Sequence, residues 1–212
     1  MKLTSIFWRI RNYLKFRMAG VKIPNGIKGF NVKNKFYLNV EKGGIVKIGN
    51  HFTFYSGDCL NPLSRNLYGC ISVDKNAILS IGDNVGISAS TIRCRKKITI
   101  GNRVTIGADV ILLDSDGHSL DYTKRGTIDD IPRCKAIEIN DDVLIGTRSI
   151  ILKGVTIGAR SIIGSGSIVS KDIPSDCIAA GNPCKVIKYL NNSCKFPILG
   201  CHLLDGCQQA PV

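Results

Sequence analysis

Residues 139–174 read INDDVLIGTRSIILKGVTIGARSIIGSGSIVSKDIP, and every sixth position from the first is Ile or Val. These aliphatic positions are Ile139, Ile145, Ile151, Ile157, Ile163 and Val169, and the fifth residues of the same hexads are Val143, Ser149, Val155, Ser161, Ser167 and Ile173. Six residues advance an α-helix by about 600°, so a helix would scatter these aliphatic side chains around its surface. A coil of short parallel strands places them on one inner face, so the hexads predict a solenoid.

The same spacing continues toward the N-terminus. It includes Cys94, Ile100, Ile106 and Leu112, then Ile81 and Ile87, and more weakly Ile48, Phe54 and Leu60. Because one coil cannot bury its aliphatic stripe alone, each coil must be stabilised by its neighbours, and both ends of the stack need caps. We therefore predict an all-β solenoid over residues 45–189, with short helical caps, an N-terminal segment at 1–44 and a tail at 190–212.

Positive charge is concentrated near the N-terminus of this 212-residue chain, whose formal net charge is +13. The first 50 residues contain eleven Lys or Arg against a single acidic residue, Glu41. Apolar residues recur among them at helical spacing: Leu3, Ile6, Phe7, Ile10 and Leu14. This pattern predicts an amphipathic helix over about the first twenty residues, which could lie on an anionic membrane surface or cap the first coil or a neighbouring subunit. Nucleic-acid binding is a weaker third option, because no binding motif accompanies the charge.

Composition favours a protein of the cytoplasm, with the inner membrane surface open to the basic helix. Charge-free stretches are shorter than the roughly 20 residues of a membrane span, and basic residues interrupt any N-terminal signal peptide. The nine cysteines are odd in number, and several lie at repeat positions that favour a small apolar side chain, so reduced thiols are expected. The tail residues Cys194, Cys201, His202 and Cys207 match no zinc-site spacing, so no metal site is predicted.

The hexads stop between Leu112 and Ile139, and residues 113–138 form a polar excursion from the coil. Long excursions from a rigid scaffold often hold functional residues. This one contains His118, and if the chain is still extended there, Asp114 and Asp116 share a face with it, although Gly117 could break the alternation. A carboxylate beside an imidazole fixes its tautomer and suits it to general base catalysis, whereas a lone loop histidine is the plain alternative.

Four motifs follow one another in the chain: DSDGHSLD at 114–121, IGTRSIILKGVTIG at 145–158, IGSGSIVSKDIP at 163–174 and AAGNPCKVI at 179–187. In this order they resemble the hexapeptide-repeat acetyltransferases, and most closely the maltose, galactoside and cell-envelope sugar O-acetyltransferases. The resemblance spans roughly residues 70–189. It implies a left-handed parallel β-helix with three hexads per coil, a homotrimer, and acetyl-CoA bound between adjacent subunits without a metal. The handedness is implied by the resemblance alone, because the general rule for parallel crossovers favours the opposite hand.

The resemblance also implies roles for single residues. His118 matches the base that deprotonates the acceptor hydroxyl, and an aspartate at the position of Asp116 is familiar among envelope-polysaccharide members. The cofactor groove would include Gly146, Thr147, Ser165, Ser170, Lys171, Lys185 and Lys188. Candidate substrate contacts are Ser88, Ser90, Asp114 and Arg125; the two serines lie where related sequences have an asparagine facing the acceptor.

The predicted function is acetyl-CoA-dependent O-acetylation of a sugar hydroxyl, in envelope or capsular polysaccharide synthesis, by direct attack with His118 as general base. An N-acetyltransferase of amino sugars could use the same scaffold and the same histidine. A metal-dependent carbonic anhydrase on a similar coil would need three clustered histidines, for which His51, His118 and His202 are poorly placed in the sequence. A non-catalytic trimeric scaffold is the remaining alternative.

Overall fold

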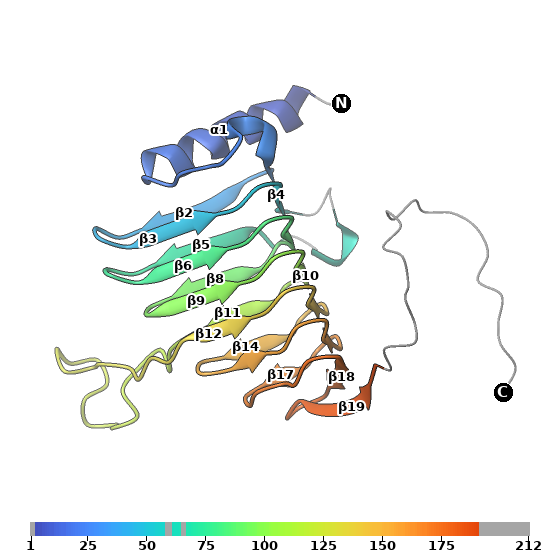
Figure 1. Cartoon of the computed structure of the whole chain (residues 1–212). Helices are drawn as coiled ribbons and strands as arrows, with labels where there is room; N and C mark the ends of the chain where they lie inside the picture. The colour runs from blue at the N-terminus through green and yellow to red at the C-terminus, as the bar shows by residue number, and fades with distance from the viewer. Residues whose placement is uncertain (1–2, 58–60, 65–66, 191–212) are drawn as a thin grey trace, which may run out of the picture.

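The computed structural model describes residues 3–57, 61–64 and 67–190, and its strands form three sheets around one core, parallel throughout except for the last strand (Figure 1). The eight-stranded sheet contains β1 (Phe30–Lys33), β4 (Phe52–Tyr55), β7 (Gly86–Ser88), β10 (Thr105–Ala108), β13 (Leu144–Ile145), β16 (Ile162–Ile163), β18 (Cys177–Ala180) and β19 (Lys185–Tyr189). The six-stranded sheet contains β2 (Phe36–Val40), β5 (Gly69–Val73), β8 (Thr91–Cys94), β11 (Ile111–Leu113), β14 (Ile150–Leu152) and β17 (Ile168–Val169). The five-stranded sheet contains β3 (Ile45–Ile48), β6 (Ile78–Ile81), β9 (Lys97–Ile100), β12 (Ile137–Ile139) and β15 (Thr156–Ile157). The remaining elements are the helix α1 (Leu3–Met18) and the 3-10 turns η1 (Gly26–Gly29) and η2 (Pro62–Ser64).

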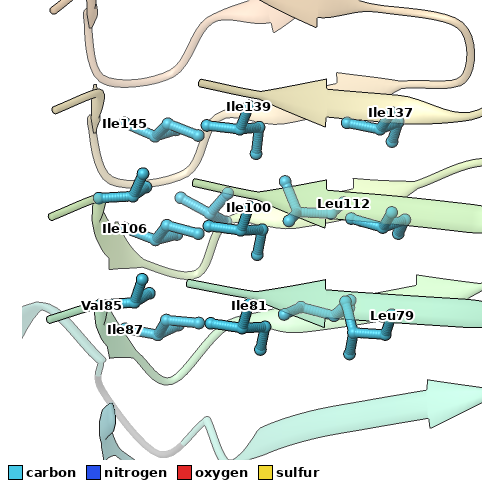
Figure 2. Packing of buried hydrophobic residues seen from close by; sticks show 14 of the residues in the cluster. Leu79, Ile81, Val85, Ile87, Ile100, Ile106, Leu112, Ile137, Ile139 and Ile145 are labelled. Carbon is cyan, nitrogen blue, oxygen red and sulfur yellow. The ribbon is translucent and has the colours of Figure 1, made fainter. Parts of the chain in front are cut away.

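The register stacks the predicted aliphatic positions directly on one another. Ile81 pairs with Ile100, Ile100 with Ile139, and Ile139 with Ile157, which follows it by 157 − 139 = 18 residues, or three hexads. Figure 2 shows this ladder beside the one formed by Ile87, Ile106 and Ile145. The prediction of a left-handed parallel β-helix with an aliphatic core is confirmed, and the upstream positions Ile48 and Phe54 also lie in the core.

The stack begins before residue 45, because β1 and β2 pair with β4 and β5. Helix α1 then lies across the N-terminal end of the stack (Figure 1). Phe16 is buried there with its ring centroid 5.0 Å from that of Phe30, and it also packs near Phe36 and Phe52. Aromatic side chains thus replace the aliphatic layer that a further coil would have supplied.

The face of α1 that contacts the stack is not the apolar face predicted from the sequence. Asn12 and Phe16 are buried against the first coil, whereas Phe7 and Leu14 are more than half exposed. Asn12 Nδ2 donates to the carbonyl oxygens of Val32 and Asn34, at 3.1 and 2.9 Å. The open end of the coil presents backbone carbonyls as well as apolar side chains, so a polar residue fits the contact better than a fully apolar stripe.

The strand β19 closes the C-terminal end of the described stack. A helical cap was expected at this end, but the described chain, which extends to residue 190, has a strand there instead. After β18 the chain reverses at residues 181–184, and β19 pairs with β18 in the antiparallel direction. The sequence of β19, KVIKY, contains β-branched and aromatic residues that favour an extended backbone over a helix. The predicted tail residues Cys194, Cys201, His202 and Cys207, like Cys59 and Leu60, lie outside the described residues.

The described cysteines Cys70, Cys94, Cys134, Cys177 and Cys184 are free thiols. Burial raises the pKa of the Cys94 thiol to about 12, so this residue packs as a small apolar side chain at its repeat position. Over the part of the chain that the structure describes, no helix has both the length and the hydropathy to cross a bilayer.

Candidate functional site

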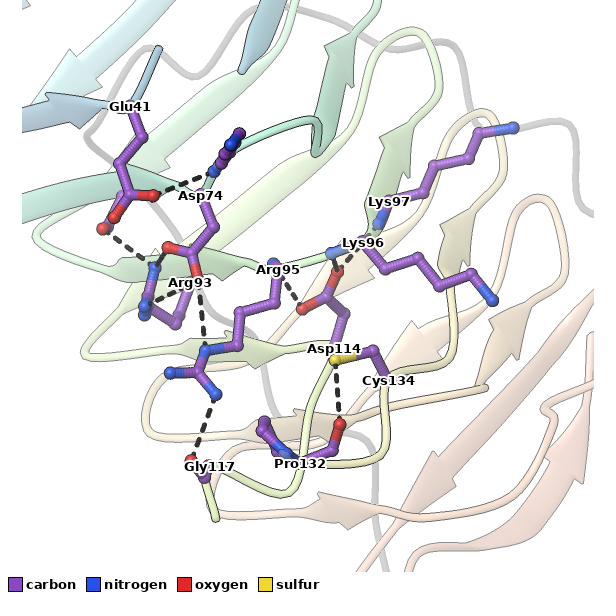
Figure 3. A network of polar contacts seen from close by, with 12 residues as sticks. Glu41, Asp74, Arg93, Arg95, Lys96, Lys97, Asp114, Gly117, Pro132 and Cys134 are labelled. Carbon is purple, nitrogen blue, oxygen red and sulfur yellow. Dashed lines mark hydrogen bonds and ion pairs between the residues drawn. The ribbon is translucent and has the colours of Figure 1, made fainter. Parts of the chain in front are cut away.

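The excursion leaves the stack after β11, returns at β12 and projects away from the coils (Figure 1). We call the edge where it leaves, between the six-stranded and five-stranded sheets, the excursion corner. Asp114 fixes the start of the excursion there: its carboxylate is fully buried and accepts the backbone N–H groups of Arg95, Lys96 and Lys97 at 2.7, 2.7 and 2.8 Å (Figure 3). The Arg95 guanidinium donates to the carbonyl oxygen of Gly117 at 3.1 Å and pairs with Asp74 at 3.2 Å. The carboxylate of Asp114, predicted to contact substrate, is thus buried and accepts three backbone N–H groups.

Replacing Asp114 with alanine is expected to lower the free energy of unfolding by about 2–4 kcal/mol, because three backbone N–H groups lose their acceptor. Urea unfolding followed by circular dichroism measures this change. Glu138→Ala is the matched control, since Glu138 is an exposed carboxylate on β12. An equal midpoint for the two variants would contradict the structural role of Asp114.

His118 pairs with an aspartate that the sequence did not single out. Its Nδ1 lies 2.7 Å from Oδ2 of Asp130, twelve residues further along the excursion. Asp130 also accepts the backbone N–H groups of Ser119 at 2.6 Å and Gly126 at 2.9 Å. The N–H groups of Gly126 and Ser119, together with the His118 ring, hold the pKa of Asp130 well below its usual range. The Asp130 side chain is 12% exposed and the His118 side chain 73% exposed, so a fixed carboxylate orients a ring that faces solvent.

Asp116, the predicted partner of His118, points elsewhere. Its Oδ1 lies 2.5 Å from Nζ of Lys153, and its buried Oδ2 has no hydrogen-bond partner among the described residues. The expected alternation of Asp114, Asp116 and His118 on one face fails because β11 ends at Leu113 and Gly117 has a φ of +79°. Lys153 was not predicted, and no spacing in the sequence connects it to Asp116.

The remaining predicted substrate residues are placed differently from one another. Ser90 is 1% exposed, and its hydroxyl lies 2.8 Å from the carbonyl oxygen of Gly107 and accepts the N–H of Val110 at 3.1 Å. Ser90, predicted to contact substrate, therefore holds a corner of the coil in this structure. Ser88 is half-buried at the end of β7. Arg125 is exposed, and its Nε donates to the carbonyl oxygen of Ser119 at 2.9 Å, so it supports the turn that follows His118.

The predicted cofactor residues lie on two edges of the three-sided stack. Gly146, Thr147 and Ser165 lie where the eight-stranded sheet passes into the six-stranded sheet, an edge that we call the glycine corner. A Cβ on Gly146 would lie 2.5 Å from the backbone nitrogen of Ser165, so only glycine lets the two coils stack this closely. Lys185 begins β19 opposite Ala180 beside this corner, and Lys188 pairs with Ile178 further along the strand.

Ser170 and Lys171 follow β17 and are exposed at the excursion corner, the edge that also carries His118. The glycine corner precedes the strands of the six-stranded sheet and the excursion corner follows them, so the length of these strands separates the two corners. Thr147 and Lys153 flank β14, so they lie at opposite ends of this side of the stack. One subunit therefore does not gather all the predicted residues around a single point. Over the described residues, no group of three or more His, Cys, Asp or Glu side chains is arranged to hold a metal ion.

Comparison with known proteins gives matches to the repeat and to the whole fold. Residues 136–171 match a family model described as bacterial transferase hexapeptide (six repeats). Galactoside O-acetyltransferase of Escherichia coli strain K12 is 38% identical over 129 residues, which are 57% of this chain and 61% of that protein. The 2,3,4,5-tetrahydropyridine-2,6-dicarboxylate N-acetyltransferase of Staphylococcus aureus strain Newman is 47% identical over 57 residues, 27% of this chain and 24% of that protein.

Among solved structures, a hexapeptide-repeat acetyltransferase of Vibrio cholerae O1 biovar eltor, in complex with acetyl coenzyme A, is similar with a TM-score of 0.55. It is 26% identical, and the match covers 86% of this chain and 78% of that chain. This chain spans about half the length of the curated relatives that it matches.

Proposed function

We infer that this chain is a hexapeptide-repeat acetyltransferase, and we propose that it transfers an acetyl group from acetyl-CoA to a hydroxyl group of a sugar. The observation that carries the proposal is the pair formed by His118 and Asp130, which an excursion anchored to the rigid stack presents to solvent. The galactoside acetyltransferase match supports the sugar acceptor, and the acetyl coenzyme A complex of a structural neighbour supports the donor.

In the proposed reaction the Asp130 carboxylate accepts a hydrogen bond from the Nδ1–H group of His118, so the lone pair of the neutral ring is on Nε2. Nε2 takes the proton of the acceptor hydroxyl as its oxygen attacks the thioester carbonyl. The C–O bond forms, the C–S bond breaks, and the proton on Nε2 passes to the departing thiolate. Backbone N–H groups at a coil edge would stabilise the oxyanion that develops on the carbonyl.

We further propose that the site is completed by a second copy of the chain within a homotrimer. The excursion corner of one copy would supply His118, Ser170 and Lys171, and the glycine corner of its neighbour would supply the flat backbone at Gly146 and Thr147. A groove between two copies joins residues that lie at opposite ends of one side of the stack within one subunit. Ser165 would line the same pantetheine arm, and Lys185 and Lys188 would face the phosphates as point charges.

The acceptor is proposed to belong to an envelope or capsular polysaccharide, with Ser88 and Arg125 as candidate contacts. An amine acceptor is the second candidate, because the N-acetyltransferase of Staphylococcus aureus shares the repeat region and an amine would also lose a proton to His118.

The proposal is tested by incubating the full chain with acetyl-CoA and a panel of hydroxyl and amino sugars. Release of the CoA thiol measures turnover, and mass spectrometry of the products locates the acetyl group on oxygen or nitrogen. O-acetylated product is the expected result. N-acetylated product would favour the second candidate, and failure to bind acetyl-CoA in calorimetry would leave the chain as a non-catalytic scaffold.

Asp130→Asn is expected to lower kcat by about 10²–10⁴-fold while the fold is retained. Asp130 Oδ2 accepts both from the ring and from the N–H of Gly126, and an amide nitrogen at that position would be a donor facing two donors. The ring would then place its proton on Nε2 and lose its function as a base. Steady-state kinetics measures the loss, and NMR of the imidazole nitrogens reports the tautomer; an unchanged tautomer would contradict the orienting role of Asp130.

A further inference from the structure

Helix α1 has a second apolar face, whose large side chains are exposed. Phe7, Ile10, Leu14 and Met18 are 59%, 44%, 52% and 87% exposed. These four side chains line one shallow apolar hollow together with Arg11 and Lys15. An exposed row of large apolar side chains on a helix that is already packed on its other face indicates a surface for binding.

The geometry of the helix directs this row away from the protein. At 100° per residue, the row of residues 7, 10, 14 and 18 is roughly 150° around the helix from Asn12, Tyr13 and Phe16, which face the stack. Figure 1 shows that α1 lies across the end of the stack, so the helix geometry directs the row outward along the axis of the stack. The row can therefore meet a flat surface without obstruction from the coils.

The charge beside the row is entirely positive. Arg11 flanks it on one side and Arg17 on the other, and both are exposed. A hollow next to α1 adds Arg9, Lys28 and Lys33, with no carboxylate among its lining residues. The first acidic residue of the chain is Glu41. This end of the molecule is therefore strongly attractive to negative charge.

We propose that the outward face of α1 binds the surface of an anionic phospholipid bilayer. The four apolar side chains enter the boundary between headgroups and acyl chains, and the flanking arginines contact lipid phosphates. Trp8, with the guanidinium of Arg11 4.9 Å from its ring centroid, lies beside the row, where tryptophan is favoured at a membrane interface. A second copy of the chain fits this face less well, because face-to-face contact would bring Arg11 and Arg17 of both copies together.

The experiment uses the full chain and phosphatidylcholine vesicles with or without about one third phosphatidylglycerol. Binding is measured by cosedimentation and by the emission of Trp8, which is the single tryptophan of the chain. We expect binding to the anionic vesicles, a blue shift of Trp8, and loss of binding as salt is raised toward 1 M, where electrostatic attraction is screened beyond about 3 Å. Equal binding to neutral vesicles, or none to anionic ones, would overturn the proposal.

Two double variants separate the apolar from the electrostatic contribution. Phe7→Asp with Leu14→Asp is expected to weaken binding by about 10²-fold or more, and Arg11→Gln with Arg17→Gln by about 25-fold, or about fivefold for each cation. Ile187→Asp, an exposed position at the opposite end of the stack, is the control and is expected to bind as the parent does. The side chains replaced in all three variants are exposed, and circular dichroism checks that each variant is folded.

The alternative occupant gives a different result. If the two apolar substitutions abolish a concentration-dependent self-association seen by light scattering, and the parent does not bind vesicles, the face is a contact between copies and the membrane proposal is wrong. Acetyl transfer to a soluble acceptor does not depend on either outcome, so failure of the proposed activity and failure of the membrane contact are distinguishable.

Discussion

Replacing His118 with alanine is expected to lower kcat by about 10²–10⁴-fold and to leave assembly and acetyl-CoA affinity nearly unchanged. The loss follows from the proposed chemistry, because a sugar hydroxyl is a poor nucleophile until a base removes its proton. The fold should survive, because the His118 side chain is 73% exposed and its hydrogen bond to Asp130 joins two residues of the same excursion. Asp130 keeps the N–H groups of Ser119 and Gly126, so the turn around it remains supported.

The measurements for His118→Ala are thiol release for kcat, calorimetry for acetyl-CoA and light scattering for the oligomer. His51→Asn is the matched control, because His51 is the other histidine of the described chain, lies in the first coil region, and has a φ of +54° that asparagine tolerates. Unchanged turnover in His118→Ala would exclude the proposed base. Loss of the oligomer with turnover would instead assign His118 to assembly.

The depressed pKa of Asp130 sets the lower end of the pH range in which the pair persists. A carboxylate whose pKa is lower in the folded protein than in the unfolded chain stabilises the fold above the unfolded value, and this contribution is lost as pH falls through the folded value. Asp130 therefore stays ionised at pH values where ordinary carboxylates have become protonated. A loss of activity between pH 8 and 5 cannot come from protonation of this residue.

The parallel coils could be predicted from the sequence because their energetic determinant is periodic. Ile139, Ile145 and Ile151 repeat a side chain that must face inward, and each occupies its predicted inner position. The motif order extended this prediction to the acetyltransferases without any knowledge of contacts. Periodicity also located the excursion, since a polar stretch that breaks the hexads cannot remain in the coil.

The partner of His118 could not be predicted in this way. Asp130 is twelve residues away in an irregular segment, where no period relates sequence distance to spatial distance. The backbone contacts of Asp114 and Ser90 could not be predicted for a related reason: a polar side chain near a proposed site can equally serve the backbone of a tight corner. Helix α1 carries apolar side chains on two faces. The face with Asn12 is the buried one because the carbonyl groups of Val32 and Asn34 accept hydrogen bonds from its amide, and these long-range contacts leave no pattern in the sequence.

Ile151→Asp is expected to prevent folding of the coil. Ile151 is fully buried in β14, where it pairs with Leu112 of β11 on one side and Val169 of β17 on the other. Loss of the aliphatic side chain alone costs about 2–5 kcal/mol, and an unpaired carboxylate among aliphatic side chains adds several more. The sum is comparable to the whole stability of a domain, about 5–15 kcal/mol, so the native state would no longer be the favoured one.

Circular dichroism and thermal unfolding measure the effect, and two further variants show that it is specific to the buried ladder. Ile151→Val removes one methylene from the same position and is expected to cost about 0.5–1.5 kcal/mol. Ile45→Asp makes the same chemical change on the outward side of β3, where the side chain is 45% exposed, and is expected to leave a cooperative transition. If Ile151→Asp unfolded at the temperature of the parent protein, the aliphatic ladder could not be the main source of stability. Because neighbouring coils stabilise one another, a break at β14 also removes the support on which Lys153 and the excursion corner depend.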